Sequence, residues 1–293
     1  MKIIPAVLLS LAASVFPAVA TDPGDGKEVL DSLEKLEAQH GGRLGVAMAQ
    51  IGNPRRELSY RGDERFAMCS TFKVLLAAAV AARVDAERES WERQIEYGKK
   101  DLIPWAPVTE KEGNLAKGAL PVEALTEAAM IWSDNTAANL MLSTVGGPEG
   151  LTRFLREHGD PTTRLDRKEP ELNANLPGDP RDTSTPEAMR GSLESILFGD
   201  VLTKASQEKI RAWMVDNRTG DKRLRAGLPK DWRVGDKTGT NDNGMANDVA
   251  VAWPGAGEPV LVVVFYHAPD ATAEQRDGVI AEVGRITRTW VDP

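Results

Sequence analysis

The sequence is poor in cysteine and histidine, and this excludes two common ways of stabilising or activating a protein. Its single cysteine, Cys69, cannot form an intramolecular disulfide, and a chain of 293 residues can bury a core that does not need one. The three histidines, His40, His158 and His267, are far apart and lack the H-x-H or H-E-x-x-H spacing of zinc ligands. We therefore expect neither a metal nor another cofactor.

Further absences narrow the class of protein. The chain has no internal repeat and no G-x-S-x-G motif, which argues against the nucleophile elbow of α/β-hydrolases. The formal net charge of −8 gives no electrostatic basis for binding nucleic acid. After residue 20, no apolar stretch is long enough to span a bilayer.

The one long apolar run lies at the start of the chain. A lysine precedes apolar residues 3–20, which end in Ala18-Val19-Ala20. This pattern is typical of a secretory signal peptide, and the alternative of a membrane anchor is disfavoured because two prolines interrupt the run. We expect a signal peptide over 1–20, cleavage near Ala20-Thr21, and a secreted or periplasmic product, 21–293, without stable membrane association.

Apolar periodicity predicts strands near both ends of the chain and helices between them. A helix over 25–40 would place Val29, Leu30, Leu33 and Leu36 on one face. Strands are expected at 43–51, 56–61, 231–238, 245–253 and 259–267. Further helices are expected at 70–84, 121–131, 135–145, 148–158, 186–198, 203–215 and 272–290. Segment 160–184 lacks periodicity and is long for a structureless loop, which indicates a functional role.

The order of these elements predicts an α/β fold in two parts. The last three strands need partners at their edge, so we expect them to pair with the two N-terminal strands in a five-stranded antiparallel sheet flanked by helices. The α/β part would comprise about 21–66 and 217–293, and an all-α part, about 67–216, would be inserted between them. A site would lie in the seam between the two parts.

A Ser-x-x-Lys pattern occurs at Ser32, Ser70 and Ser206, but only Ser70 opens a strongly apolar helix. There its hydroxyl would lie near the positive helix N-terminus, where backbone amides can bind an oxyanion. Lys73 falls on the same helical face, and burial beside another cation would favour its neutral, proton-accepting form. The structural alternative is that Ser70 only caps the helix.

Two further motifs follow in order. Ser133-Asp134-Asn135 precedes a predicted helix and would cap it in the simpler interpretation. Lys237-Thr238-Gly239 ends the predicted strand that runs from Trp232 through Asp236. It is either a turn with a solvated lysine or a sheet edge that Gly239 leaves open to a ligand. Between them lies Glu169-Pro170-Glu171-Leu172-Asn173. Their joint occurrence in this order argues against coincidence.

Together with Asp101 to Val108 and Ala246-Asn247-Asp248, these motifs resemble class A serine β-lactamases over nearly the whole mature chain. The resemblance implies the two-part β-lactamase fold and a monomer that acts on small β-lactam molecules. It implies acylation of a serine by penicillins and cephalosporins, followed by hydrolysis, and hence resistance to these drugs.

The resemblance implies a catalytic role for four residues. Ser70 would be the nucleophile, Lys73 its proton acceptor, Ser133 the proton donor to the β-lactam nitrogen, and Glu169 the base that activates water for deacylation. The amides of Ser70 and Thr240 would form the oxyanion hole. Whether Lys73 or Glu169 accepts the first proton is disputed for the family, and the sequence leaves this open.

The resemblance also implies a set of substrate-binding residues. They are Trp105, Asn135, Asn173, Arg223, Lys237, Thr238, Gly239 and Thr240. Lys237 and Thr238 would line the pocket, Lys237 and Thr240 would bind the substrate carboxylate, and Asn135 its side-chain amide. Trp105 would form the wall of the cleft mouth, or else be a half-buried surface tryptophan. Arg223 would assist with the carboxylate, or else be a surface cation.

Segment 160–184 would be the family's loop below the site. Arg167 and Asp182 would form an ion pair that closes it, with Arg164 as a second anchor, and the Glu169–Pro170 bond would be cis as in the family. Carbapenem-hydrolysing relatives often link the cysteine before the nucleophile to a second one, but Asn241 stands there in this sequence. That difference lowers the expectation of strong carbapenem hydrolysis.

Two related functions remain alternatives. A penicillin-binding D,D-peptidase shares the first three motifs and would be acylated without fast release, and a β-lactam sensor would also retain the drug. Glu169, with Asn173 beside it, is the feature that favours hydrolysis over the D,D-peptidase. The sensor is disfavoured because such a domain normally needs a transmembrane partner, which we do not expect here.

Overall fold

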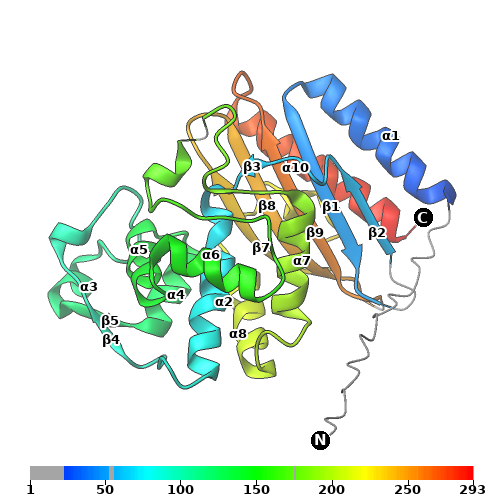
Figure 1. The fold of residues 1–293 in the computed structure, drawn as a ribbon. Coiled ribbons are helices and arrows are strands. Elements are labelled where there is room, and N and C mark those ends of the chain that lie inside the picture. Colours follow the sequence, from blue (N-terminus) through cyan, green and yellow to red (C-terminus); the bar gives the residue numbers. More distant parts are fainter. Residues whose placement is uncertain (1–22, 53–55, 175, 256, 293) are drawn as a thin grey trace, which may run out of the picture.

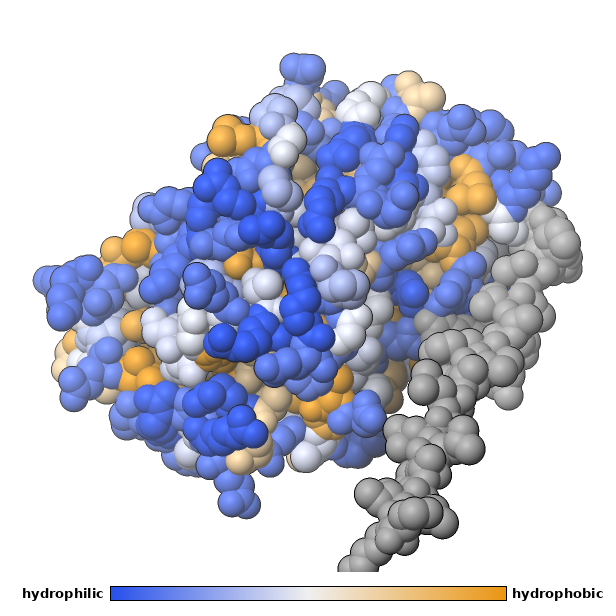
Figure 2. Space-filling view, in the orientation of Figure 1, coloured by the Kyte–Doolittle hydropathy of each residue, from blue (hydrophilic) through white to orange (hydrophobic). Residues whose placement is uncertain are grey.

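The computed structural model describes residues 23–52, 56–174, 176–255 and 257–292. The expected signal peptide, 1–20, and its cleavage site lie outside these ranges. Among the described residues, no helix combines the length and the apolar character needed to cross a membrane. Figure 2 shows one face of the molecule, which is mostly hydrophilic with small, scattered apolar areas.

A five-stranded antiparallel sheet with the strand order β2-β1-β9-β8-β7 joins the two ends of the chain. Its strands are β1 (Arg43–Gln50), β2 (Arg56–Tyr60), β7 (Arg233–Thr240), β8 (Met245–Trp253) and β9 (Val260–His267). Seven of the eight residues of β9 are buried, because helices cover both faces of the sheet. Sequential strands β7, β8 and β9 form a meander, and β1 then pairs with β9. The predicted fold class is confirmed.

Helices α1 (Pro23–His40) and α10 (Ala273–Val291) pack together over one face of the sheet (Figure 1). The other face contacts α7 (Pro186–Leu197), and α8 (Lys204–Val215) packs against β7. One predicted detail of α1 is wrong: Leu30 is 36% exposed, whereas Val29, Leu33 and Leu36 are buried.

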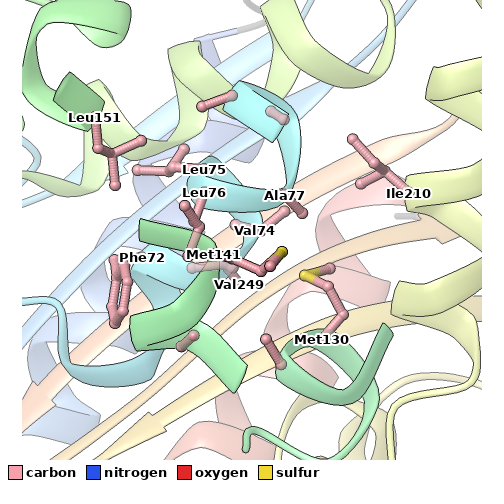
Figure 3. Close-up of a cluster of buried hydrophobic side chains, with 14 of the residues drawn as sticks. Phe72, Val74, Leu75, Leu76, Ala77, Met130, Met141, Leu151, Ile210 and Val249 are labelled. Atoms are coloured by element: carbon pink, nitrogen blue, oxygen red, sulfur yellow. The ribbon is translucent and has the colours of Figure 1, made fainter. Parts of the chain in front are cut away.

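The helical part surrounds α2 (Phe72–Asp85), which is buried from Phe72 to Ala81. Figure 3 shows its residues Val74 to Ala77 among side chains of neighbouring helices, such as Met130, Met141 and Ile210. The other helices are α3 (Glu112–Lys117), α4 (Val122–Ile131), α5 (Asn135–Thr144), α6 (Gly147–Glu157) and α9 (Leu224–Gly227). The boundaries expected between the two parts of the fold remain a prediction.

Several short elements were not expected from the sequence. They are the short helices α3 and α9, the strands β3 (Phe66–Ala67), β4 (Gln94–Glu96), β5 (Ala119–Pro121) and β6 (Thr183–Ser184), and the 3₁₀ turns η1 (Cys69–Thr71), η2 (Lys99–Asp101) and η3 (Glu171–Asn173). Two boundaries change the interpretation of motifs. Ser70 lies in η1 rather than in the first turn of the helix, and β7 continues through Lys237-Thr238-Gly239 to Thr240, two residues beyond the predicted end of the strand.

Candidate active site

The sequence motifs meet in a cavity of about 910 Å³ between the edge strand β7 and the helical part. Ser70 is contributed by η1, Ser133 and Asn135 by the start of α5, and Glu169 by the loop before η3. The cavity is lined by most of the expected site residues: Ser70, Trp105, Ser133, Asn135, Glu169, Asn173, Arg223, Thr238, Gly239 and Thr240. Lys73 and Lys237 lie beneath this lining, fully buried.

Lys73 is the buried centre of the polar network. Its Nζ donates to Asn135 Oδ1 at 2.6 Å and to the carbonyl oxygen of Ser133 at 2.8 Å, and it lies 3.3 Å from Glu169 Oε1. Burial lowers the pKa of Lys73, while the charge of Glu169 opposes this shift. A lysine whose pKa is lowered loses its proton at a lower pH than usual, and the resulting amine can act as a base.

Glu169 contacts the nucleophile directly. Ser70 Oγ donates to Glu169 Oε1 at 3.2 Å, and Asn173 Nδ2 donates to Glu169 Oε2 at 2.6 Å. The backbone of Glu169 is held by Asn139 of α5, whose amide exchanges two hydrogen bonds with it, at 2.8 and 3.0 Å. Glu169 is thus buried and held at both its side chain and its backbone, unlike a solvated loop acid.

Asn139 was missed by the sequence analysis. It lies four residues after Asn135 on α5, so the two asparagines share one helical face. The spacing of four residues could have identified Asn139 from the sequence. If Asn135 faces the site, Asn139 on the same side of the helix must lie near it.

Ser133 lies between the two buried lysines. Its Oγ accepts from Lys237 Nζ at 3.0 Å and from Lys73 Nζ at 3.3 Å. Burial lowers the pKa of Lys237 well below its usual range, and the neighbouring charge of Lys73 lowers it further. The expectation that Lys237 lines the cavity is wrong, because Lys237 supports Ser133 from below. Thr238 does line it.

Asp134, the middle residue of the Ser133-Asp134-Asn135 motif, has a structural role. It caps α5 by accepting from the amide of Ala137, as the simpler interpretation of this motif expected. The same carboxylate also accepts from the amides of Val108 and Thr109, which fastens the segment after Trp105 to α5. Ser133 has φ of 58°, a left-handed conformation that the surrounding contacts must maintain.

Arg223 is buried and joins three elements. It donates to the carbonyl oxygens of Gly239 on β7 (2.9 Å) and Asn247 on β8 (2.7 Å), and it pairs with Asp277 on α10 (2.7 Å). It also donates to Thr240 Oγ1 at 2.7 Å, at the wall of the cavity. The alternative of a surface cation is therefore wrong.

Gly239 permits the close approach of β7 to the turn that carries the nucleophile. A Cβ atom at this position would lie 2.6 Å from the carbonyl oxygen of Met68 and 3.2 Å from the amide nitrogen of Ser70. The packing of β7 against η1 thus requires glycine at this position. This is a second reason for glycine, besides the expected one that it leaves the sheet edge open to a ligand. It brings the edge of β7, which continues to Thr240, beside Ser70.

Trp105 stands at the cavity wall and is 62% exposed, so it is not half-buried. Its Nε1 donates to the carbonyl oxygen of Trp132, and its own carbonyl oxygen accepts from the amide of Asn135 at 2.9 Å. The ring is therefore anchored at one edge while its faces remain accessible. Asn135 Nδ2 donates to the carbonyl oxygen of Pro104.

The loop between Asp160 and Ser184 is closed by the expected ion pair. Arg167 Nε lies 2.5 Å from Asp182 Oδ2, and the buried Asp182 also accepts from the amides of Asp166 and Arg167. Arg164 pairs with Asp166 at a more exposed position. The Glu169–Pro170 peptide bond is cis.

No group of three or more histidine, cysteine, aspartate or glutamate side chains in the described part of the chain is arranged to hold a metal ion.

Comparison with known proteins identifies the family. Residues 28–291 match the model of the β-lactamase enzyme family. The chain is 42% identical to β-lactamase Toho-1 of Escherichia coli over 267 residues, which cover 91% of this chain and 90% of that protein. It is 44% identical to β-lactamase OXY-2 of Klebsiella oxytoca over 254 residues, or 87% and 86% of the two chains.

Solved structures support the same family assignment. An ancestral class A β-lactamase superimposes with a TM-score of 0.85 and 55% identity, covering 88% of this chain and 98% of that one. A β-lactamase from Xanthomonas campestris has a TM-score of 0.87 and 44% identity, covering 91% and 98%. The chain belongs to the β-lactamase enzyme family and, within it, to class A.

Proposed function

We propose that this enzyme hydrolyses the β-lactam amide of penicillins and cephalosporins through an acyl-enzyme on Ser70, and so confers resistance to these antibiotics. β-Lactam hydrolysis is the activity after which its family is named. The observation that carries the serine mechanism is the position of Glu169. Its buried Oε1 lies 3.2 Å from Ser70 Oγ and 3.3 Å from Lys73 Nζ, within reach of a general base.

Acylation uses the groups around Ser70. Its Oγ attacks the β-lactam carbonyl carbon and loses its proton to Lys73 or Glu169, while the amides of Ser70 and Thr240 stabilise the oxyanion. The C–N bond of the ring then breaks, and Ser133 gives its hydroxyl proton to the nitrogen. The two lysines that donate to Ser133 Oγ support this role, because Lys73 can return a proton to it.

Deacylation uses Glu169 and Asn173. Water attacks the ester carbonyl, Glu169 accepts its proton, and Ser70 leaves with a proton restored to its Oγ. Asn173 Oδ1 is buried and has no hydrogen-bond partner among the described residues, while its Nδ2 holds the carboxylate. This free acceptor beside Glu169 is suited to orienting the water molecule.

Substrate recognition would use the rest of the lining. Arg223 and Thr240 supply positive charge and a hydroxyl group for the substrate carboxylate, with the charge of Lys237 behind them. Asn135 would bind the side-chain amide, and the exposed ring of Trp105 would pack on the bicyclic nucleus. We propose that the enzyme acts as a monomer on such small molecules.

We also propose export of the enzyme to the periplasm or the medium. The motivation is the signal-like sequence before Thr21. Mass spectrometry of the protein recovered outside the cytoplasm tests this, since a mature chain should begin near Thr21. Recovery of the uncleaved chain from the cytoplasm alone would contradict it.

The decisive experiment mixes residues 21–293 with benzylpenicillin and follows absorbance and intact mass together. Many turnovers that leave mostly unmodified protein are expected of a β-lactamase. A single equivalent consumed, with a lasting adduct on Ser70, would instead indicate a penicillin-binding D,D-peptidase or a sensor. Glu169→Gln should retain acylation and accumulate the adduct; turnover equal to the parent would remove Glu169 from the mechanism.

A further inference from the structure

Two asparagine side chains fasten the turn between β7 and β8 to the loop that carries Glu169. Asn241 Nδ2 donates to the carbonyl oxygen of Asn173 at 2.9 Å, and Asn243 Nδ2 donates to the carbonyl oxygen of Ala174 at 2.9 Å. The two acceptors are consecutive carbonyls at the end of η3. We call this pair of contacts the amide clamp.

The turn provides a firm support for the clamp. Asn241 is 8% exposed, and its Oδ1 accepts from the amides of Asn243 (3.0 Å) and Met245 (2.9 Å). His267, the last residue of β9, contacts the carbonyl oxygen of Asn243 through Nε2 at 3.1 Å. Oδ1 and Nδ2 of Asn241 therefore have different partners. The turn fixes the orientation of the side-chain amide, and the amide in turn holds the loop.

The clamp acts on Glu169 through one residue. Asn173, whose carbonyl oxygen the clamp holds, donates from Nδ2 to Glu169 Oε2 at 2.6 Å. On the opposite side, Asn139 of α5 holds the backbone of Glu169. Glu169 is consequently positioned from two sides. Asn139 in the helical part holds its backbone, and Asn241 and Asn243, in the turn of the sheet, hold the residues that follow it in the loop.

We infer that Asn241 and Asn243 are positioning residues for deacylation, because they keep Asn173 aligned with Glu169 and with the attacking water. This inference rests on the proposed function. Neither asparagine side chain donates to Ser70, Lys73 or Ser133, so with Lys73 as the first base acylation should be affected less than deacylation. A displacement of about 1 Å at a catalytic group can cost on the order of a hundredfold in rate, so a loosened Asn173 should slow deacylation measurably.

Asn241→Asp isolates the clamp from the turn. The aspartate keeps an oxygen for the amides of Asn243 and Met245, but it replaces the Nδ2 donor by a second oxygen that repels the carbonyl oxygen of Asn173. Asn243→Ala removes the second contact alone. Asn114→Asp is the matched control, because Asn114 also donates to a backbone carbonyl, that of Val108, and has no contact with the loop.

The experiment measures acylation by stopped flow with nitrocefin, steady-state kcat and KM, and the acylated fraction by intact mass. For Asn241→Asp we expect deacylation and kcat to fall at least about tenfold, KM to fall in parallel, and kcat/KM to change less than about threefold. Asn243→Ala should show a smaller change of the same kind, and Asn114→Asp none.

Three outcomes would overturn the inference. Unchanged kcat in both variants would show that the clamp does not position Asn173. An equal loss of kcat and kcat/KM would place the effect on acylation or on folding rather than on deacylation. A kcat loss of the same size in Asn114→Asp would make the effect nonspecific. Failure of the proposed function appears separately, as absence of turnover in the parent enzyme.

Discussion

The ion pair between Arg167 and Asp182 closes the loop that carries Glu169, and we predict that Asp182→Asn loosens this loop at a measurable cost in stability. Asp182 has φ of 59°, a conformation that asparagine tolerates, so the substitution removes charge without a backbone clash. The buried carboxylate accepts from two backbone amides through Oδ1 and from Arg167 Nε through Oδ2.

The expected magnitude follows from these three contacts. Asparagine can keep its oxygen on the two backbone amides, so the loss centres on the contact with Arg167. A hydrogen bond to a charged group contributes about 1.5–3 kcal/mol, and an unsatisfied buried donor costs about 1–3 kcal/mol. We expect the free energy of unfolding to fall by about 2–4 kcal/mol, which corresponds to a decrease in Tm on the order of 10 °C for a chain of this size.

Chemical and thermal unfolding, followed by circular dichroism, measure this change. Arg164→Ala is the control, because the Arg164–Asp166 pair belongs to the same loop but leaves the arginine side chain 39% exposed. An exposed ion pair contributes less than about 1 kcal/mol. If Asp182→Asn lost no more stability than Arg164→Ala, the argument from burial would be refuted.

Two further predictions concern the reaction. Arg223→Ala should raise KM for benzylpenicillin on the order of tenfold, because the substrate carboxylate loses its charged donor near Thr240; unchanged steady-state kinetics would leave that role to Lys237 and Thr240. Because burial lowers the pKa of Lys73, the acylation rate should rise with pH as Nζ loses its proton, below the usual range of lysine. Single-turnover acylation as a function of pH tests this, and a rate independent of pH would exclude Lys73 as the base.

The sequence predicted the sheet and the main helices because apolar periodicity determines which faces are buried. The length and continuous apolar character of the runs at 43–51 and 259–267 placed both strands within one residue of β1 and β9. Periodicity alone overstated the apolar face of the first helix, since Leu30 lies at the margin of that face and remains partly exposed.

The sequence could not reveal how the site is supported. Asn241 and Asn243 act through hydrogen bonds to backbone groups of a distant loop, and such contacts depend on how segments meet in space. The burial of Lys237 beneath the cavity also depends on how segments pack together. It follows from β7 continuing to Thr240 and from the close packing that Gly239 permits against η1. The motifs thus predicted the reacting groups, and tertiary packing determined what holds them.

The pairing of β1 with β9 also bears on when the enzyme becomes active during its biosynthesis. Arg43 of the first strand pairs with His267 near the far end of the chain, and β8 and β7 assemble onto β9. Pairings so distant in sequence form slowly. A nascent chain that ends after α8 already contains Ser70 and Glu169 but lacks β7, β8 and β9. We therefore expect hydrolysis only after β7, β8 and β9 have been synthesised, and products truncated before β7 should be inactive.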